Sequence, residues 1–283
     1  MLNFACDYLD GAHPKVFEAL EACNYLKTGC YGVGDAVSDA ARAKIREACG
    51  APEAEIYFLS GGTQTNKVVL STLLKPWQSV IAAKTGHIAV HEAGAIEASG
   101  HKVVELSGTD GKLSAEQVEN VFIAWEKDDN REHMPQPGAV YVTQPTEYGT
   151  LYSLKELTAI SECCRRHGAV LYLDGARLFY GLAAEGAQFD ALFTDGLGME
   201  MARHADGEAD RIRDALVKKG YTVLFGGRTN QIFVLLTNAA AEKLQQSVAM
   251  GFWERPDADH VVERIATSWS TDPKETDALI AVL

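Results

Sequence analysis

An aspartate and an arginine stand three positions apart in LYLDGAR, residues 171–177. The apolar run before Asp174 is typical of a buried strand, so Asp174 is expected at the carboxyl end of that strand, where a buried carboxylate needs a partner. Two interpretations stay open. Asp174 pairs with Arg177 for purely structural reasons, or both residues serve a ligand, because open α/β sheets bind ligands at the carboxyl ends of their strands.

Two further segments place reactive or ligand-binding groups at strand ends. LSGGTQTNKVV, residues 59–69, predicts a strand, a glycine-rich turn and then a helix. The first N–H groups of that helix, with the hydroxyls of Thr63 and Thr65, would form a phosphate cradle. The segment is neither a Walker loop nor a GxGxxG fingerprint, and a plain tight turn explains it equally well. His87 follows another apolar run, and taken alone a histidine in this position is more often a capping or packing residue than a catalytic one.

These groups need a scaffold, and short apolar runs alternate with helical patterns through the first 180 residues. Such alternation predicts βαβ units, and continuous apolar strands fit a mostly parallel central sheet with helices on both faces. The helices at 114–127 and 153–168 open with capping boxes. Strands are expected at 56–60, 79–83, 102–106, 139–143 and 169–173, and a further helix at 66–74.

The last hundred residues have a different pattern. Residues 188–219 predict a long helix, after which strands and helices alternate in a way that is typical of a smaller α+β domain. The sequence therefore predicts a large α/β domain at 1–187 and an interdomain helix with a small domain at 188–283. The expected small-domain strands are 221–225, 231–236 and 263–268, and the expected helices lie near 238–250 and at 273–282.

Composition narrows the class of partner. The 283 residues carry 39 acidic and 26 basic side chains, a net charge of −13, which argues against nucleic acid and anionic membranes as partners. No basic region precedes an apolar run at the start, and no run reaches the roughly 18 apolar residues of a membrane span. The six cysteines form no CxxC pair, so reduced thiols and a cytoplasmic location are expected. No metal site is predicted.

The order of these motifs is more specific than any one of them. A phosphate-type loop, a histidine after the next strand, DGAR after a later strand and RIATSW near the end resemble the pyridoxal-phosphate enzymes of the aspartate-aminotransferase fold. More narrowly, the chain resembles the low-specificity L-threonine aldolases of the β-eliminating lyase group. The resemblance runs from FACDYLDGAHP, residues 4–14, to RIATSW, residues 264–269, and QPTEYGT, residues 144–150, is its most distinctive segment beside DGARL.

The resemblance implies a lyase that uses pyridoxal 5'-phosphate to cleave small β-hydroxy-α-amino acids, turning threonine into glycine and acetaldehyde by retro-aldol chemistry. It also implies a homodimer or homotetramer. The ring of the cofactor would act as the electron sink, and arginine forks suit the substrate carboxylate. The implied roles are phosphate binding for Gly62 and Thr63, with Cys6 standing where the family commonly has serine; ring stacking for His87; pairing with the ring nitrogen for Asp174; and carboxylate binding for Arg177 and Arg264.

One group of the family has no counterpart here. The resemblance implies a lysine that tethers the cofactor as a Schiff base in a turn after DGAR, yet no lysine occurs between Lys155 and Lys218. About sixty residues, two βα-type units in length, are expected to be absent after Ala187, which would remove two interior strands between the first strand and the DGAR strand. Two alternatives therefore stay open: a lysine-less member that binds cofactor or dimerises without turnover, and an unrelated α/β protein that binds a phosphorylated metabolite.

Overall fold

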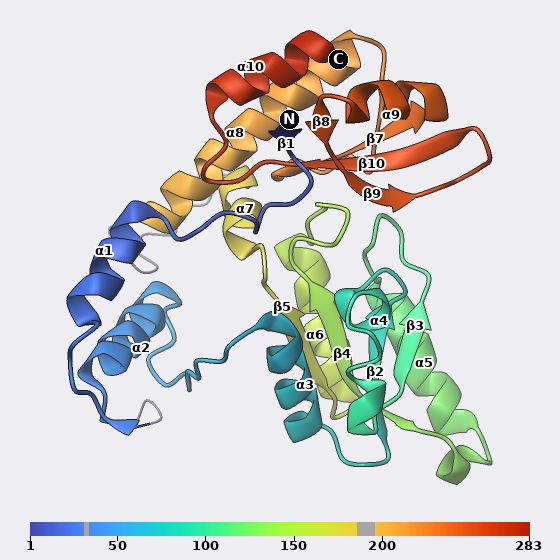
Figure 1. Cartoon of the computed structure of the whole chain (residues 1–283). Coiled ribbons are helices and arrows are strands. Elements are labelled where there is room, and N and C mark those ends of the chain that lie inside the picture. The colour runs from blue at the N-terminus through green and yellow to red at the C-terminus, as the bar shows by residue number, and fades with distance from the viewer. Residues whose placement is uncertain (31–33, 186–195) are drawn as a thin grey trace. The chain divides into compact units, whose positions relative to one another are not determined.

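The computed structural model describes residues 1–30, 34–185 and 196–283 (Figure 1). These residues form two compact units. The sheet unit comprises residues 58–181 and 225–227, and the terminal unit comprises residues 1–57, 182–224 and 228–283. The predicted division between 1–187 and 188–283 stays a prediction, because its boundary and the join after Ala187 fall outside the described residues.

A four-stranded parallel sheet with the order β3-β2-β4-β5 forms the sheet unit. The two central strands are almost entirely buried, as their continuous apolar sequences predict. The predicted α/β class with a parallel sheet is therefore confirmed. The strands are β2 (Gln78–Ala83), β3 (Val103–Leu106), β4 (Gln136–Thr143) and β5 (Val170–Asp174).

Helices cover both faces of this sheet. Successive residues of β2 point to opposite faces, so Ile81 packs in one core cluster and Val80 in another. Helices α5 (Ala115–Lys127) and α6 (Leu154–Arg166) supply Val118, Phe122 and Ile160 to the first cluster, and both begin with the predicted capping boxes. Helix α3 (Gly62–Leu73) supplies Leu70 to the second cluster. His87 opens only a short helix, α4 (His87–Val90).

The prediction of a strand at residues 56–60 is wrong, since these residues form no strand and Tyr57 and Phe58 are 75% and 50% exposed. A strand needs a neighbouring edge to satisfy its N–H and C=O groups. Among the described residues no strand pairs with the outer side of β5. The loss of two interior strands between the first strand and β5 stays a prediction.

The terminal unit has an antiparallel four-stranded sheet with the order β6-β7-β10-β9, so the predicted strands at 221–225, 231–236 and 263–268 are present. Helices α8 and α10 pack together over this sheet (Figure 1). The predicted helix at 188–219 is confirmed from Leu197 onward, and its earlier part lies outside the described residues. The elements are β6 (Thr222–Leu224), β7 (Gln231–Thr237), β9 (Gly251–Glu254), β10 (His260–Ala266), α8 (Leu197–Lys218), α9 (Asn238–Gln245) and α10 (Pro273–Val282).

Short elements complete the chain. The strands β1 (Leu2–Asn3) and β8 (Val248–Ala249) pair in parallel and fix the N-terminus to the terminal unit. Helices α1 (Pro14–Cys23) and α2 (Ala36–Ala48) contain no buried residue, and α7 (Leu178–Ala184) follows β5. In the described part of the chain, no helix is long and apolar enough to cross a membrane.

Candidate functional site

Asp174 ends β5, and hydrogen bonds hold both of its carboxylate oxygens. Oδ2 accepts from the Tyr141 hydroxyl at 2.6 Å and from Asn66 Nδ2 at 3.3 Å, and Oδ1 accepts from the Ala176 N–H at 3.0 Å. Burial and the negative charge of Asp174 raise the pKa of Tyr141 above its usual range, so the phenol remains a donor. Asp174 is thus an oriented acceptor at the carboxyl end of the parallel sheet.

His87 stands at the end of β2 with its ring held by a carboxylate. Its Nδ1 lies 2.7 Å from Glu92 Oε1, and the Glu92 side chain is fully buried, whereas the His87 side chain is 41% exposed. A carboxylate can only accept, so the proton of a neutral His87 ring lies on Nδ1 and its Nε2 is left as a base. The backbone N–H of His87 donates to Glu147 Oε1 at 2.8 Å.

Glu147 brings the QPTEYGT segment against His87. Its second oxygen accepts from the Thr143 hydroxyl at 3.1 Å. Burial raises the pKa of Glu147 to about 6, although the hydrogen bonds and His87 act in the opposite direction. A carboxyl group that changes charge near neutral pH therefore lies one hydrogen bond from the backbone of the candidate base.

The sequence predicted Asp174 and His87 but missed the residues that join them. Asn66 Nδ2 donates to Glu92 Oε1 at 2.6 Å as well as to Asp174, so the two predicted residues belong to one hydrogen-bonded cluster, which we call the Asn66 cluster. A signal was available: Asn66 lies four residues before the buried Leu70, on the inward face of α3. A polar residue on the buried stripe of a helix requires partners.

The predicted phosphate cradle lies at the N-terminus of α3. Gly62 and Thr63 begin the helix and are exposed, and no side chain caps the helix at Gly61. A Cβ added at Gly62 would meet nothing within 4 Å, so the space beside these N–H groups is open. The first N–H groups of a helix lack acceptors within the helix. An open helix start, an oriented carboxylate and an exposed histidine ring fit the phosphate, ring nitrogen and ring face of pyridoxal phosphate.

Arg177 and Arg264 have different surroundings. Arg177 lies in the turn between β5 and α7 and is half-buried. Arg264 lies on β10, where Nη2 donates to the Ala5 carbonyl at 3.0 Å and Nη1 to Gln231 Oε1 at 3.4 Å. Its Nε is buried without a partner. A guanidinium fixed at two nitrogens with a third donor unused suits a carboxylate ligand.

Cys6 belongs to the segment that holds Arg264. Its thiol is half-buried and lies 3.9 Å from Asp7 Oδ1. The segment is anchored to the terminal unit by the Phe4 carbonyl, which accepts from the Ala266 N–H at 2.8 Å, and by Asp10, which accepts from the Ser268 hydroxyl at 2.8 Å. The terminal unit therefore brings Cys6 and Arg264 onto adjoining segments, while the other predicted residues belong to the sheet unit.

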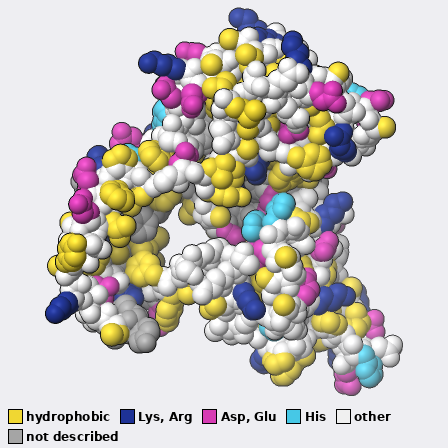
Figure 2. Space-filling model, viewed as in Figure 1, with side chains coloured by type: hydrophobic (Ala, Val, Ile, Leu, Met, Phe, Trp, Pro, Cys, Tyr) yellow, Lys and Arg dark blue, Asp and Glu magenta, His cyan; other side chains and the backbone are white. Residues whose placement is uncertain are grey.

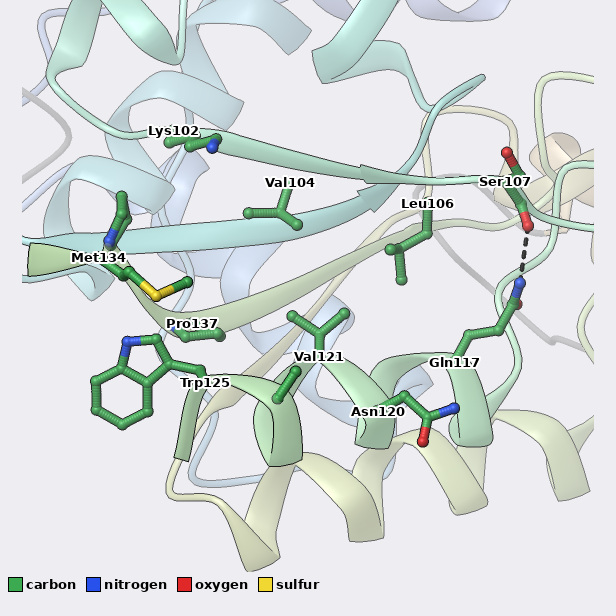
Figure 3. Close-up of a pocket in the computed structure, with 12 residues that line it drawn as sticks. Lys102, Val104, Leu106, Ser107, Gln117, Asn120, Val121, Trp125, Met134 and Pro137 are labelled. Carbon is green, nitrogen blue, oxygen red and sulfur yellow. Dashed lines mark hydrogen bonds between the residues drawn. The ribbon is translucent and has the colours of Figure 1, made fainter. Parts of the chain in front are cut away.

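A pocket of about 540 Å³ lies along β3 and α5, away from these groups. Figure 3 shows Val104, Leu106 and Val121 facing it, with Gln117 Nε2 donating to the Ser107 carbonyl at 2.7 Å. None of the predicted site residues lines this pocket, and its wall is mostly apolar. Chemistry needs converging polar groups, so the carboxyl ends of β2, β4 and β5 are the candidate site.

Comparisons with known proteins agree with this arrangement. A solved structure of Leishmania major threonine aldolase superposes on all of this chain and 98% of its own with a TM-score of 0.92 at 31% identity. A low-specificity L-threonine aldolase of a Pseudomonas species is 34% identical over 179 residues, which are 62% of this chain and 49% of that protein. A putative L-allo-threonine aldolase structure from Listeria monocytogenes, 18% identical, shares the fold over 99% of this chain and 92% of its own with a TM-score of 0.68.

The fold and the cluster at its strand ends place the chain among α/β proteins of the pyridoxal-phosphate type. The family model described as beta-eliminating lyase matches residues 16–207. The chain therefore belongs to the beta-eliminating lyase family. It spans about half the length of the curated relatives that it matches.

Proposed function

We propose that this chain binds pyridoxal 5'-phosphate at the carboxyl ends of β2, β4 and β5. The observation that carries the proposal is Asp174, an oriented carboxylate whose Oδ2 accepts from Tyr141 and Asn66. Asp174 would pair with the ring nitrogen and keep it protonated, and the exposed ring of His87 would stack on the cofactor. Gly62 and Thr63 would bind the phosphate at the start of α3, with Cys6 as a further contact on the phosphate side.

The proposed reaction is cleavage of β-hydroxy-α-amino acids, with threonine giving glycine and acetaldehyde. When bound, the cofactor supplies the electron sink that makes the Cα–Cβ bond breakable. Arg177 and Arg264 would hold the substrate carboxylate, since a guanidinium matches the two oxygens of a carboxylate. His87, whose Nδ1 faces Glu92, would accept the proton of the β-hydroxyl group at Nε2.

A second candidate function is cofactor binding without turnover. The sequence between Lys155 and Lys218 contains no lysine to tether the cofactor, and this observation favours a family member that holds the cofactor without a covalent bond. Both candidates require the same noncovalent contacts. They differ in whether the bound cofactor turns over an amino acid.

Acetaldehyde release from threonine distinguishes the two candidates. The purified protein would be saturated with pyridoxal phosphate and assayed with a coupled alcohol dehydrogenase. Threonine cleavage that is lost in His87→Phe, which keeps an aromatic face but has no base, supports the lyase. His133→Phe, at an exposed position of the sheet unit, is the matched control. Cofactor binding without acetaldehyde supports the second candidate, and no cofactor binding refutes both.

We propose a homodimer or homotetramer on the evidence of the N-terminal helices. Neither α1 nor α2 has a buried residue, and Val16, Phe17 and Leu20 of α1 are 46–64% exposed. Figure 2 shows hydrophobic side chains gathered over these helices. Apolar surface of this extent is typical of a protein interface.

We also propose a cytoplasmic location. The six cysteines are free thiols, as is usual for proteins of a reducing compartment.

A further inference from the structure

Asn66 occupies a position that none of the proposed roles explains. It lies on α3, its side chain is 2% exposed, and its partners come from parts of the chain 26 and 108 residues away. Buried amides are kept only where their hydrogen bonds are satisfied. The partners of Asn66 therefore indicate what the residue does.

The orientation of the amide is fixed from both ends. Oδ1 accepts from the Tyr172 hydroxyl at 2.6 Å, which leaves Nδ2 to donate to Glu92 at 2.6 Å and to Asp174 at 3.3 Å. An amide nitrogen has two N–H groups, so one residue can serve two carboxylates. The two carboxylates disfavour the flipped arrangement, because Oδ1 would then face groups that can only accept.

We propose that Asn66 is a positioning residue that orients Asp174 for the cofactor nitrogen and Glu92 for His87 at the same time. The inference rests on the proposed cofactor site. Two carboxylates that lie close together repel each other, and a donor shared between them holds both in place. Asn66 supplies a neutral donor to each, so that Asp174 remains an acceptor for the ring nitrogen and Glu92 remains an acceptor for His87 Nδ1.

The experiment uses 4′-deoxypyridoxine 5′-phosphate as the probe. This compound has the ring nitrogen and phosphate of the cofactor but no aldehyde, so its binding does not depend on any lysine. Its dissociation constant would be measured by calorimetry for the full chain and for Asn66→Ala. A lost hydrogen bond to a charged group predicts binding about ten- to a hundredfold weaker. Thr72→Ala on the same helix, where the hydroxyl contacts only the Val68 carbonyl, is expected to bind like the parent protein.

Asn66→Asp separates positioning from packing, because it keeps the shape and changes the donor. When protonated, the new carboxyl can still donate to one carboxylate; when ionised, it faces Glu92 and Asp174 as a third negative charge, with the Tyr172 hydroxyl as its only close donor. Those neighbours and burial raise its pKa. Relative to the parent protein at each pH, the variant is expected to bind the probe almost normally near pH 5 and about tenfold or more weakly near pH 8.

The outcomes test the cofactor site and the positioning role of Asn66 separately. Failure of the parent protein to bind the probe would refute the cofactor site itself. Parent-like binding by Asn66→Ala, or a loss in Asn66→Asp that is the same at every pH, would overturn the positioning role while leaving the cofactor site intact. Circular dichroism checks folding, and if Asn66→Ala does not fold, the pH series of Asn66→Asp decides alone.

Discussion

The carboxyl ends of the parallel strands and the outer side of β5 are two regions of the same sheet that differ in their contacts. At the carboxyl ends of β2, β4 and β5, polar groups from distant segments meet in the Asn66 cluster with hydrogen bonds of 2.6–3.3 Å. Along the outer side of β5, no described strand continues the sheet, and Val170 and Leu173 are 38% and 36% exposed. The contacts of the cluster are made by residues of α3, α4, β4 and β5 and by Glu92, so they do not need the strands that are expected to be absent. The continuation of the sheet and the lysine both belong to the segment that is expected to be absent.

The largest effect is expected on cofactor affinity, from a substitution at the carboxyl ends of the parallel strands. Replacing Asp174 by alanine removes the proposed partner of the ring nitrogen and leaves Tyr141 without its acceptor, while Asn66 keeps Glu92. Loss of one partner of a buried charged pair predicts cofactor binding weaker by at least about thirtyfold. Titration of pyridoxal phosphate followed by absorbance checks this, with Asp129→Ala in an exposed loop as the control. Unchanged affinity would contradict the proposal that the cofactor binds at the carboxyl ends of the strands.

The outer edge of β5 is expected to cause self-association. An unpaired edge with exposed apolar side chains is a template for another chain. Val170→Lys places a charge at this edge and is expected to shift the sedimentation profile toward smaller species. Leu154→Lys exchanges a residue that is 83% exposed at the start of α6, and it serves as the matched control. If both variants sediment like the parent protein, the β5 edge is not the site of association.

A smaller effect, on the stability of the fold, is expected from the burial of Glu147 near the carboxyl ends of the strands. The pKa of Glu147 is raised from 4.5 to about 6, mainly by burial. The folded state therefore binds a proton on Glu147 more tightly than the unfolded state. The stability that this proton contributes is lost as pH rises from about 4.5 to about 6. Relative to Glu147→Gln, the free energy of unfolding of the parent protein is expected to fall by up to about 2 kcal/mol between about pH 4.5 and pH 6.

Urea unfolding at several pH values measures this difference. Glu105→Gln, at an exposed position of β3, is the control and is expected to follow the parent protein. A parent protein that gains stability over Glu147→Gln as pH rises would contradict the sign of the effect and would indicate that ionised Glu147 is stabilised by its donors.

Sequence patterns predicted the elements whose signals are local. The capping boxes at Ser114 and Ser153 are formed as expected, and the apolar runs of β2 and β4 are buried in a parallel sheet. Asp174 and His87 were found because each follows an apolar run and therefore stands at a strand end.

Features that depend on distant partners could not be predicted in the same way. Asn66 meets Asp174 only through the fold, since 108 residues separate them. Residues 56–60 have the composition of a strand, but a strand forms only when it pairs with a neighbour, and this segment pairs with no strand among the described residues. Asp174 could be predicted from LYLDGAR because its signal is local. Strand pairing beyond β5 could not be predicted, because it depends on segments that are distant in the sequence.

The central claim is that the cofactor site is retained at the carboxyl ends and that the covalent tether is absent. The most direct test saturates the protein with pyridoxal phosphate, reduces it with borohydride and measures the intact mass. The account predicts saturable binding that depends on Asp174, with no cofactor attached after reduction. One cofactor attached per chain, mapped to a single lysine, would contradict it.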